Sequence, residues 1–233
     1  MTGGRGEAFG RSGGGSGARP APALVSVNVG LPRDVEWRGR TVRTAIFKGP
    51  VTGAVRVRRL NLDGDGQADP TVHGGPNKAV YLYPSEHYAY WRDLLGELAW
   101  GAFGENLTTA GLSEEAVRIG DRLRLGTAEL VVTQPRLPCF KLAVKFGRAD
   151  IEKRFLESGM TGFYLSVAAE GEITAGDAVS VVGFPGDSVT VAEVVRLYRS
   201  ERPDAGTLRR LADLPVLPEG LREHFRRLGD RAG

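Results

Sequence analysis

One cysteine, Cys139, is present in 233 residues, so no disulfide can form within the chain. A single thiol is typical of a reducing compartment, and we expect a cytoplasmic protein. The same scarcity disfavours an iron–sulfur cluster, because such clusters usually take several thiolates. Long apolar runs are also lacking: none approaches the ~20 residues that a membrane helix needs. No apolar segment of the kind found in secretory signals follows the first basic residues.

An excess of charge of one sign is lacking as well. Thirty-one basic residues stand against 28 acidic ones, which leaves a formal net charge of +3. A balance this close does not predict a long nucleic-acid-binding stripe, although it is compatible with a small basic pocket. Branched apolar residues are nearly absent from residues 1–22, which are rich in Gly, Ser and Pro. These residues cannot bury enough surface to offset the entropy of ordering, so we predict a disordered tail.

Short segments typical of β-strands, separated by Gly and Pro, follow in residues 23–186. "ALVSVNVG" and "VRVRRL" alternate apolar and polar residues, and "DAVSVVG" is a third such segment. "TVRTAIFKGPV" predicts a strand that breaks at Gly49-Pro50, and "DRLRLGTAELVVTQ" predicts a hairpin around Gly126-Thr127. Strands of this number and spacing favour a mainly β (α+β) domain, folded as a barrel or a curved sheet.

Two predicted helices interrupt these strands. In "PSEHYAYWRDLLGEL", with Ser85 as a candidate N-cap, one face carries the apolar stripe. That stripe consists of Tyr88, Trp91, Leu95 and Leu98. "ADIEKRFLESGM" predicts a second helix that ends at Gly159. The aromatic residues between positions 81 and 91 could stack nucleic-acid bases, but their spacing favours a place in the core.

Residues 187–233 predict a small domain of three helices. "TVAEVV" contains a capping box, Thr190 with Glu193, at the start of an apolar stripe. "TLRRLADL" and "LREHFRRL" supply two more amphipathic segments. A DNA-reading unit is one alternative, but acidic residues nearly match the arginines, which favours an interaction or docking module.

The segment "QPRLPCFK" directly follows the apolar stretch "ELVVT". Pro135 and Pro138 fix their own φ angles and push the preceding residues toward extended geometry, so a stiff arch should present Cys139 in one orientation. Arg136 and Lys141 flank the thiol, and nearby positive charge favours a thiolate, which is both a nucleophile and a soft metal ligand. A buried, inert cysteine is the alternative.

The loop "DGDGQADPTVHGGPNK" begins like a calcium-binding loop. Asp63, Asp65 and Gln67 occupy its first, third and fifth positions. The Gly and Glu that a calcium loop requires further on are replaced by Ala68 and Gly74, which argues against calcium. We therefore predict that the acidic half of this loop is a solvated turn.

The second half of the same loop, "HGGPNK", predicts an anion site. Gly74 and Gly75 let backbone N–H groups turn toward an anion, Lys78 adds positive charge and His73 adds a hydrogen bond. A plain turn is the alternative. In a third loop, "GAFGENLTTAGL", the polar side chains of Asn106 and Thr108 could bind a polar ligand or form local turns.

Five segments of this chain occur in an order found in a known family. They are "TAIFKGPV", "GDGQADPTVHGGPNKAVYLYPSEHYAYW", "GENLTTAGL", "IGDRLRLG" and "QPRLPCFKL". The series resembles MOSC-domain proteins, the molybdenum cofactor sulfurase C-terminal family, and most of all its YiiM-like branch of the 6-N-hydroxylaminopurine resistance type. The resemblance runs from Leu24 to about Leu228, including a C-terminal "3-alpha" domain. Asn77 departs from it, since the family commonly has an acidic residue there.

The resemblance implies a β-barrel-like domain that binds molybdenum cofactor (molybdopterin), with Cys139 as the molybdenum ligand. It carries pyridoxal phosphate binding as a weaker, family-level expectation. Cys139 would be catalytic, and His73 is the candidate proton donor. The residues expected to hold the anionic cofactor are Lys48, Gly74, Gly75, Lys78, Asn106, Thr108, Arg136 and Lys141.

The implied reaction is the two-electron reduction of N-hydroxylated compounds, such as purine bases, to amines. Because the chain has one cysteine and no dinucleotide-binding fingerprint, electrons should come from a separate flavin or iron–sulfur reductase, which the three-helix domain could dock. No membrane or nucleic-acid partner is expected. Two alternatives remain open: a sulfur carrier with a Cys139 persulfide, and a non-enzymatic binding module.

Overall fold

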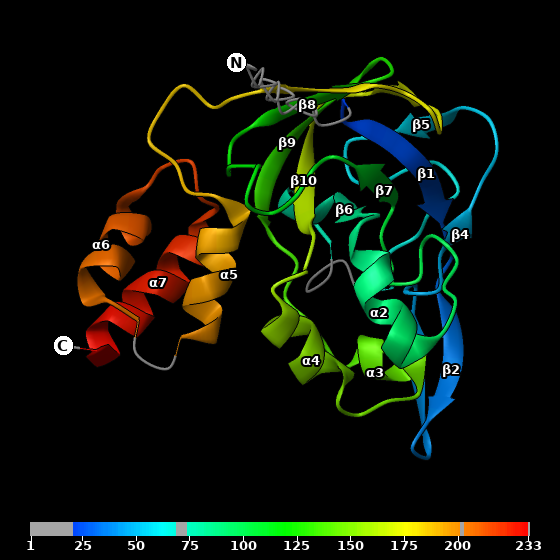
Figure 1. The fold of residues 1–233 in the computed structure, drawn as a ribbon, viewed down its shortest axis with the longest axis horizontal. Coiled ribbons are helices and arrows are strands. Elements are labelled where there is room, and N and C mark those ends of the chain that lie inside the picture. Colours follow the sequence, from blue (N-terminus) through cyan, green and yellow to red (C-terminus); the bar gives the residue numbers. More distant parts are fainter. Residues whose placement is uncertain (1–20, 69–73, 201–202, 233) are drawn as a thin grey trace, which may run out of the picture.

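The computed structural model describes residues 21–68, 74–200 and 203–232 (Figure 1). Eight strands form its main sheet: β1 Ala23–Val29, β4 Gly49–Pro50, β6 Val80–Pro84, β7 Leu107–Ala110, β8 Arg122–Leu125, β9 Ala128–Pro135, β10 Phe163–Ala169 and β12 Val179–Val182. Their order across the sheet is β12-β8-β9-β10-β6-β7-β1-β4. The pair β6 and β7 is parallel, and the other neighbours are antiparallel.

The main sheet closes on itself between β1 and the segment that leads into β12. Leu24 N donates to Asp177 O at 2.9 Å, and Gly176 N donates to Leu24 O at 2.7 Å. Val179 N donates to Pro22 O at 2.8 Å. These bonds satisfy backbone groups that an open edge would leave unpaired. The structure thus confirms the expected α+β fold with a β-barrel-like domain.

The local strand predictions are correct in part. β8 and β9 form the predicted hairpin, in which Leu125 pairs with Ala128. The single strand predicted for "TVRTAIFKGPV" is wrong: β3 Arg40–Thr44 ends early and pairs with β2 Arg33–Trp37 in a separate hairpin. The chain turns after Thr44, whose hydroxyl accepts from Ile46 N at 3.2 Å. Gly49-Pro50 is then no break but the short strand β4 beside β1.

Two further short elements complete the barrel domain's backbone. β5 Val55–Val57 pairs antiparallel with β11 Gly171–Ile173 in a separate two-stranded sheet. The 3₁₀ helix η1 Pro76–Lys78 leads directly into β6. It follows Gly75, whose positive φ of 86° is a conformation that favours glycine.

Both predicted helices of the barrel domain form. α2 His87–Leu95 buries Tyr88 and Trp91, but Ser85 does not cap it, because Glu86 is the N-cap residue. α4 Ile151–Ser158 ends at Gly159 as predicted. A third helix, α3 Lys141–Phe146, was not predicted, because only six residues follow the proline arch before Gly147 ends it.

An aromatic core fills the space between α2, α4 and β6. Tyr83 stacks on Phe103 with ring centroids 4.6 Å apart, and Trp91 Nε1 donates to the Tyr83 hydroxyl at 2.8 Å. Tyr81 donates to Thr161 O at 2.8 Å. Most of the aromatic run is therefore buried in the core, as its spacing predicts.

The C-terminal segment forms the three predicted helices, α5 Val191–Arg199, α6 Ala205–Asp213 and α7 Glu219–Ala232, which lie beside the barrel (Figure 1). The capping box is present, since Glu193 N donates to Thr190 Oγ1 at 3.1 Å and Thr190 N donates to Glu193 Oε2 at 2.7 Å. Buried side chains of these helices belong to the same apolar cluster as those of the barrel. The predicted boundary at position 186 lies between β12 and α5.

The predicted tail, apart from positions 21 and 22, lies outside the described residues, and so does His73. Among the helices that the structure describes, none combines the length and the apolar character that crossing a bilayer requires.

Candidate functional site

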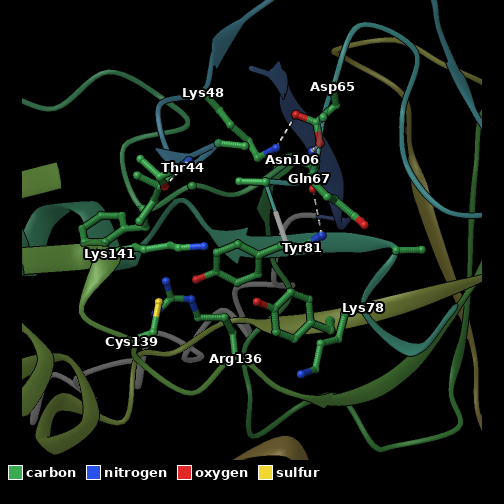
Figure 2. Close-up of a pocket in the computed structure, with 18 residues that line it drawn as sticks. Thr44, Lys48, Asp65, Gln67, Lys78, Tyr81, Asn106, Arg136, Cys139 and Lys141 are labelled. Atoms are coloured by element: carbon green, nitrogen blue, oxygen red, sulfur yellow. Dashed lines mark hydrogen bonds and ion pairs between the residues drawn. The ribbon is translucent and has the colours of Figure 1, made fainter. Parts of the chain in front are cut away.

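A hollow beside β6 gathers polar side chains from distant parts of the sequence (Figure 2). Its cations come from two loops, from the end of η1 and from the start of α3. They are Lys48, Lys78, Arg136 and Lys141. Its other polar lining consists of Thr44, Asp65, Gln67, Tyr81, Asn106, Cys139 and Tyr164. Because four cations and one thiol line this hollow, we call it the cationic hollow.

Cys139 lies where β9 gives way to α3. Pro135, the last residue of β9, pairs with Phe163 of β10, and Cys139 O accepts from Leu142 N at 2.9 Å. The arch between them is therefore held at both ends by backbone hydrogen bonds. The thiol is half-buried and lines the cationic hollow, so it is accessible to a ligand there. Cys139 is therefore not fully buried, as the alternative supposed.

Arg136 is a buried cation without a matching carboxylate. Its side chain packs over aromatic rings, 5.2 Å from the Phe155 centroid and 5.7 Å from the Tyr81 centroid. Its Nη1 is buried and has no hydrogen-bond partner, and no carboxylate of the described chain forms a salt bridge with it. Burial of an uncompensated charge is costly, and a bound anion would supply the missing partner.

Lys48 has the partner that Arg136 lacks. Its amine donates to Asp65 Oδ1, which also accepts from Gly30 N at 2.9 Å. Asn106 Nδ2 donates to the second oxygen of Asp65 at 3.0 Å. Burial lowers the pKa of Lys48, while the charges of Asp65 and Glu105 act in the opposite direction. This wall of the hollow is therefore complete without a ligand.

The prediction that the acidic loop is a solvated turn is wrong for one of its aspartates. Asp63 is exposed and pairs with Arg58 at 2.8 Å, but the Asp65 side chain is only 3% exposed because Lys48 and Asn106 hold it inside. No group of three or more His, Cys, Asp or Glu side chains within the described ranges could hold a metal ion. Asp65 thus positions the amine of Lys48.

Asn106 and Thr108, both expected to contact a cofactor, lie in different places. Asn106 lines the hollow, but its amide is engaged: Oδ1 accepts from Tyr81 N at 3.1 Å, and Nδ2 donates to Asp65. Thr108 is buried behind the lining, where its hydroxyl donates to Glu105 Oε1 at 3.0 Å. Both residues therefore support the wall of the hollow through other residues.

Glu105, which the sequence did not single out, anchors the loop before β7. Its oxygens accept from Gly101 N at 2.8 Å, from Phe103 N at 3.0 Å and from the Tyr88 hydroxyl. Burial raises its pKa, although these hydrogen bonds favour the charged form. The fully buried carboxylate fixes the segment that carries Asn106 toward the hollow.

The other predicted anion-binding residues separate into two groups. Lys78 and Lys141 line the cationic hollow, and burial lowers the pKa of Lys78. Gly74 and Gly75 do not line it but line a neighbouring hollow. Figure 2 shows the amine of Lys141, the guanidinium of Arg136 and the sulfur of Cys139 grouped at one side of the Tyr81 ring.

Comparison with known proteins identifies the family. Residues 69–180 match the MOSC domain, and residues 189–228 match the YiiM-like, 3-alpha helix domain. Protein YiiM of Escherichia coli (strain K12) is 42% identical over 158 residues, which are 66% of this chain and 70% of that protein. The chain belongs to the YiiM-like MOSC family. Uncharacterized protein YflK of Bacillus subtilis (strain 168) is 40% identical over 90% of this chain and 95% of its own length.

Similarity to this MOSC protein extends to solved structures and to a longer relative. The crystal structure of YiiM from Geobacillus stearothermophilus has a TM-score of 0.74 and 35% identity, and the match covers 91% of this chain and 100% of that chain. A protein of Gibberella moniliformis (strain M3125 / FGSC 7600) named Reductase is 34% identical over 76% of this chain and 32% of its own length. This chain therefore corresponds to about a third of that relative.

MOSC domains in general bind molybdenum cofactor, and the cationic hollow of this MOSC protein fits such a group. Cys139 offers one soft thiolate donor, which suits a metal whose other ligands come with the cofactor. The orphaned Nη1 of Arg136, with Lys78 and Lys141 nearby, suits anionic groups. The residues present therefore agree with the family's cofactor in both ligand type and charge.

Two lining residues that the sequence did not reveal are Tyr81 and Tyr164. They stand opposite each other in the register of β6 and β10, with ring centroids 5.4 Å apart. The alternation in "VYLYP" indicates a strand, but the strand that pairs with it is not readable from a local pattern. Their place in the site follows from non-local pairing.

Proposed function

We propose that this MOSC protein binds molybdenum cofactor through Cys139 and reduces N-hydroxylated compounds, such as N-hydroxylated purine bases, to amines. The observation that carries the proposal is the accessible Cys139 thiol in the same hollow as Arg136, a buried cation with an unpartnered Nη1. A soft donor beside an uncompensated cation suits a ligand that combines a metal with anionic groups. The relative named Reductase supports an oxidoreductase class.

The proposed reaction consumes two electrons and two protons. The N–O bond of the substrate breaks, the nitrogen remains on the product as an amine, and the oxygen leaves as water. Molybdenum cofactor, when bound, would supply the exchange of two electrons. The chain itself would bind and orient that cofactor: Arg136, Lys78 and Lys141 attract its anionic part, and the Lys48–Asp65 pair keeps the opposite wall in place.

We infer that the electrons reach this chain from a separate flavin or iron–sulfur reductase. The single thiol of the chain cannot hold an iron–sulfur cluster of the usual kind. The relative named Reductase is about three times as long as its match to this chain, which supports a need for further protein parts. Docking of that reductase by the three-helix domain stays a prediction.

Metal analysis after expression in a host that makes molybdenum cofactor tests the proposal. We expect a stoichiometric amount of molybdenum in the wild type and a loss of more than about tenfold in Cys139→Ser, since a hydroxyl is a poor soft-metal ligand. Phe140→Ala, which changes an exposed neighbour, is the matched control and should retain the metal. An electron paramagnetic resonance spectrum of the partly reduced protein should show thiolate-ligated molybdenum.

Other results of the same experiment would contradict the proposal. A persulfide on Cys139 without molybdenum would indicate a sulfur carrier. Molybdenum content that is equal in the wild type and Cys139→Ser would remove the thiol from the metal site. Steeply salt-dependent DNA binding that survives Cys139→Ser would indicate a nucleic-acid-binding module instead.

A further inference from the structure

The hairpin of β2 and β3 has two faces of different chemistry. Residues that stand opposite each other in its register share a face, so Asp34 lies beside Arg43, and Glu36 lies beside Thr41. Arg43 donates to Asp34 at 3.1 Å, and the Thr41 hydroxyl donates to Glu36. Both carboxylates of the hairpin therefore lie on one face, and each has a partner within the hairpin.

The other face of the hairpin carries cations and an aromatic ring. Arg33, Trp37 and Arg40 belong to it by the same register. The guanidinium of Arg33 lies 3.7 Å from the ring centroid of Phe47, and Lys145 Nζ lies 4.7 Å from the same centroid. Burial and, to a lesser degree, the charge of Arg33 lower the pKa of Lys145. The Phe47 ring therefore joins the hairpin to α3 and holds two cations near each other.

Arg38 adds a cation at the turn of the hairpin, in a backbone conformation that favours other residue types. Its φ is 50°, and that of Gly39 is 73°. Asn and Gly take such a turn with less strain, and among the described residues Arg38 is the only one besides glycine with a positive φ. Its guanidinium lies 5.2 Å from the Trp37 ring centroid. Strain retained at an exposed cation indicates a function for its side chain.

The cations of this region are not neutralised by the protein. The region, which we call the basic face, consists of Arg33, Trp37, Arg38, Arg40 and Lys145. None of its four cations forms a salt bridge with a carboxylate in the part of the chain that the structure describes. In the three-helix domain, by contrast, Arg222 and Arg226 share the carboxylate of Glu219. The basic face can therefore attract a partner with an acidic surface.

The basic face continues into the cationic hollow. Thr44, the last residue of β3, lines that hollow together with the two residues after it. On α3, Lys145 lies one turn beyond Lys141, which lines the hollow too. Figure 1 shows β2 beside α3, in agreement with the ring contacts of Phe47. A protein that covered the basic face would therefore reach the lining of the hollow that contains the Cys139 thiol.

We propose that the basic face docks the electron donor, and that this donor is a protein with an acidic surface around its redox group. The inference rests on the proposed reductase function and adds to it the place and the charge of the partner, which gives up two electrons for each N–O bond broken. Arginine and tryptophan are residue types that protein interfaces concentrate. Complementary charge accelerates encounter by about 10- to 1,000-fold at low salt, which suits the small interfaces of electron-transfer partners.

Binding of a flavodoxin, a small acidic flavin protein, tests the docking site. Arg38→Gln/Arg40→Gln should lower its affinity, measured by isothermal titration calorimetry in about 50 mM salt, by at least about fivefold. The matched control is Arg196→Gln/Arg209→Gln, which removes the same charge from exposed positions of α5 and α6 and should bind as the wild type does. This control also tests docking by the three-helix domain. Thermal melts of both variants would show that they fold.

Several results would overturn the assignment. One is equal affinity of the wild type and the folded Arg38→Gln/Arg40→Gln protein. Another is a loss of the same size in the control, because net charge or the three-helix domain would then determine binding. A wild type that binds no flavodoxin is a third. If Arg38→Gln/Arg40→Gln weakened the binding of a single-stranded oligonucleotide and not that of flavodoxin, the basic face would be a nucleic-acid site.

Two further measurements separate this inference from the proposed function. Arg38 and Arg40 are outside the lining of the cationic hollow, so their double variant should keep its molybdenum and its rate with dithionite as reductant. Its rate with reduced flavodoxin should fall. Cys139→Ser, which we expect to lack the metal, should bind flavodoxin as the wild type does. A wild type without molybdenum would defeat the proposed function, while its affinity for flavodoxin would still decide the docking site.

Discussion

Lys48 and Arg136 are two buried cations on opposite walls of one hollow, and they differ in whether a carboxylate pairs with them. Lys48 is neutralised by Asp65, which Asn106 and a backbone N–H hold in place. Arg136 has rings on which to pack but no carboxylate within the described part of the chain, and its Nη1 has no partner. The protein itself neutralises the cation of one wall, whereas a bound anion would be needed to pair with the cation of the other.

The difference separates residues that hold the site from residues that hold the ligand. Removing a cation from a buried pair leaves its carboxylate uncompensated, so the change should reduce the stability of the fold. Removing a cation that pairs with no carboxylate leaves no such charge behind, so the change should reduce ligand binding. The two variants that follow test this contrast directly.

The largest effect is expected from Lys48→Met. The free energy of unfolding in urea should fall by about 3–5 kcal/mol, because Asp65 would remain buried without a cation. Lys48→Met/Asp65→Asn, which also removes the carboxylate charge, should recover part of the loss. If the double variant were no more stable than the single one, the Lys48–Asp65 pair would not be what holds this wall.

Arg136→Met should show the opposite balance. Its free energy of unfolding should change by less than about 1 kcal/mol, since the relief of burying a charge offsets the lost ring contacts. The affinity for molybdenum cofactor should fall about 10- to 100-fold, because a hydrogen bond to a charged group usually contributes that much to binding. If the unfolding midpoint of Arg136→Met dropped as far as that of Lys48→Met, Arg136 would stabilise the fold as Lys48 does, and the proposed difference between the two walls would be wrong.

A pH dependence should follow from Lys78, whose pKa burial lowers. The protonated amine attracts an anion below its own pKa, so the affinity for sulfate, whose own charge does not change in this range, should be highest while Lys78 is protonated. It should decline as the pH rises, starting below the 10.5 of an ordinary lysine. Lys78→Arg keeps its charge and should move the decline to higher pH in calorimetric titrations. An identical pH profile for both proteins would remove Lys78 from the anion site.

The smallest effect concerns the proline arch that presents Cys139. Pro138→Ala frees one φ angle in the unfolded chain and should cost no more than about 1 kcal/mol of stability. Cofactor should nevertheless dissociate a few times faster, because the thiol loses part of its fixed orientation. Unchanged molybdenum content and dissociation rate would show that backbone hydrogen bonds alone suffice to position the arch.

Features that depend on neighbours in the sequence could be predicted. The hairpin of β8 and β9, the capping box of Thr190 and Glu193, and the place of Arg136 beside Cys139 all belong to this class. The family resemblance added the barrel, because long motifs in order carry information on non-local pairing that periodicity does not. For these features the predictions made from the sequence match the structure.

Features that depend on distant contacts could not be predicted. Asp65 occurs in a loop of aspartates and glycines that reads as solvated, and only the fold brings Lys48 and Asn106 to it. Thr108 is placed behind the lining by its bond to Glu105, a carboxylate whose burial no local pattern reveals. Charge and residue type therefore predicted which side chains could bind an anion. They did not predict which of these side chains already pair with other residues of the protein.

The bonds that close the barrel impose an order on its synthesis. β1 is made early, but the residues around Asp177 that bind its free edge are among the last of the barrel to leave the ribosome. Until then the nascent chain carries an unpaired strand of the kind that aggregates. A translation arrest or truncation before Asp177 should consequently be more harmful to solubility than loss of the three final helices.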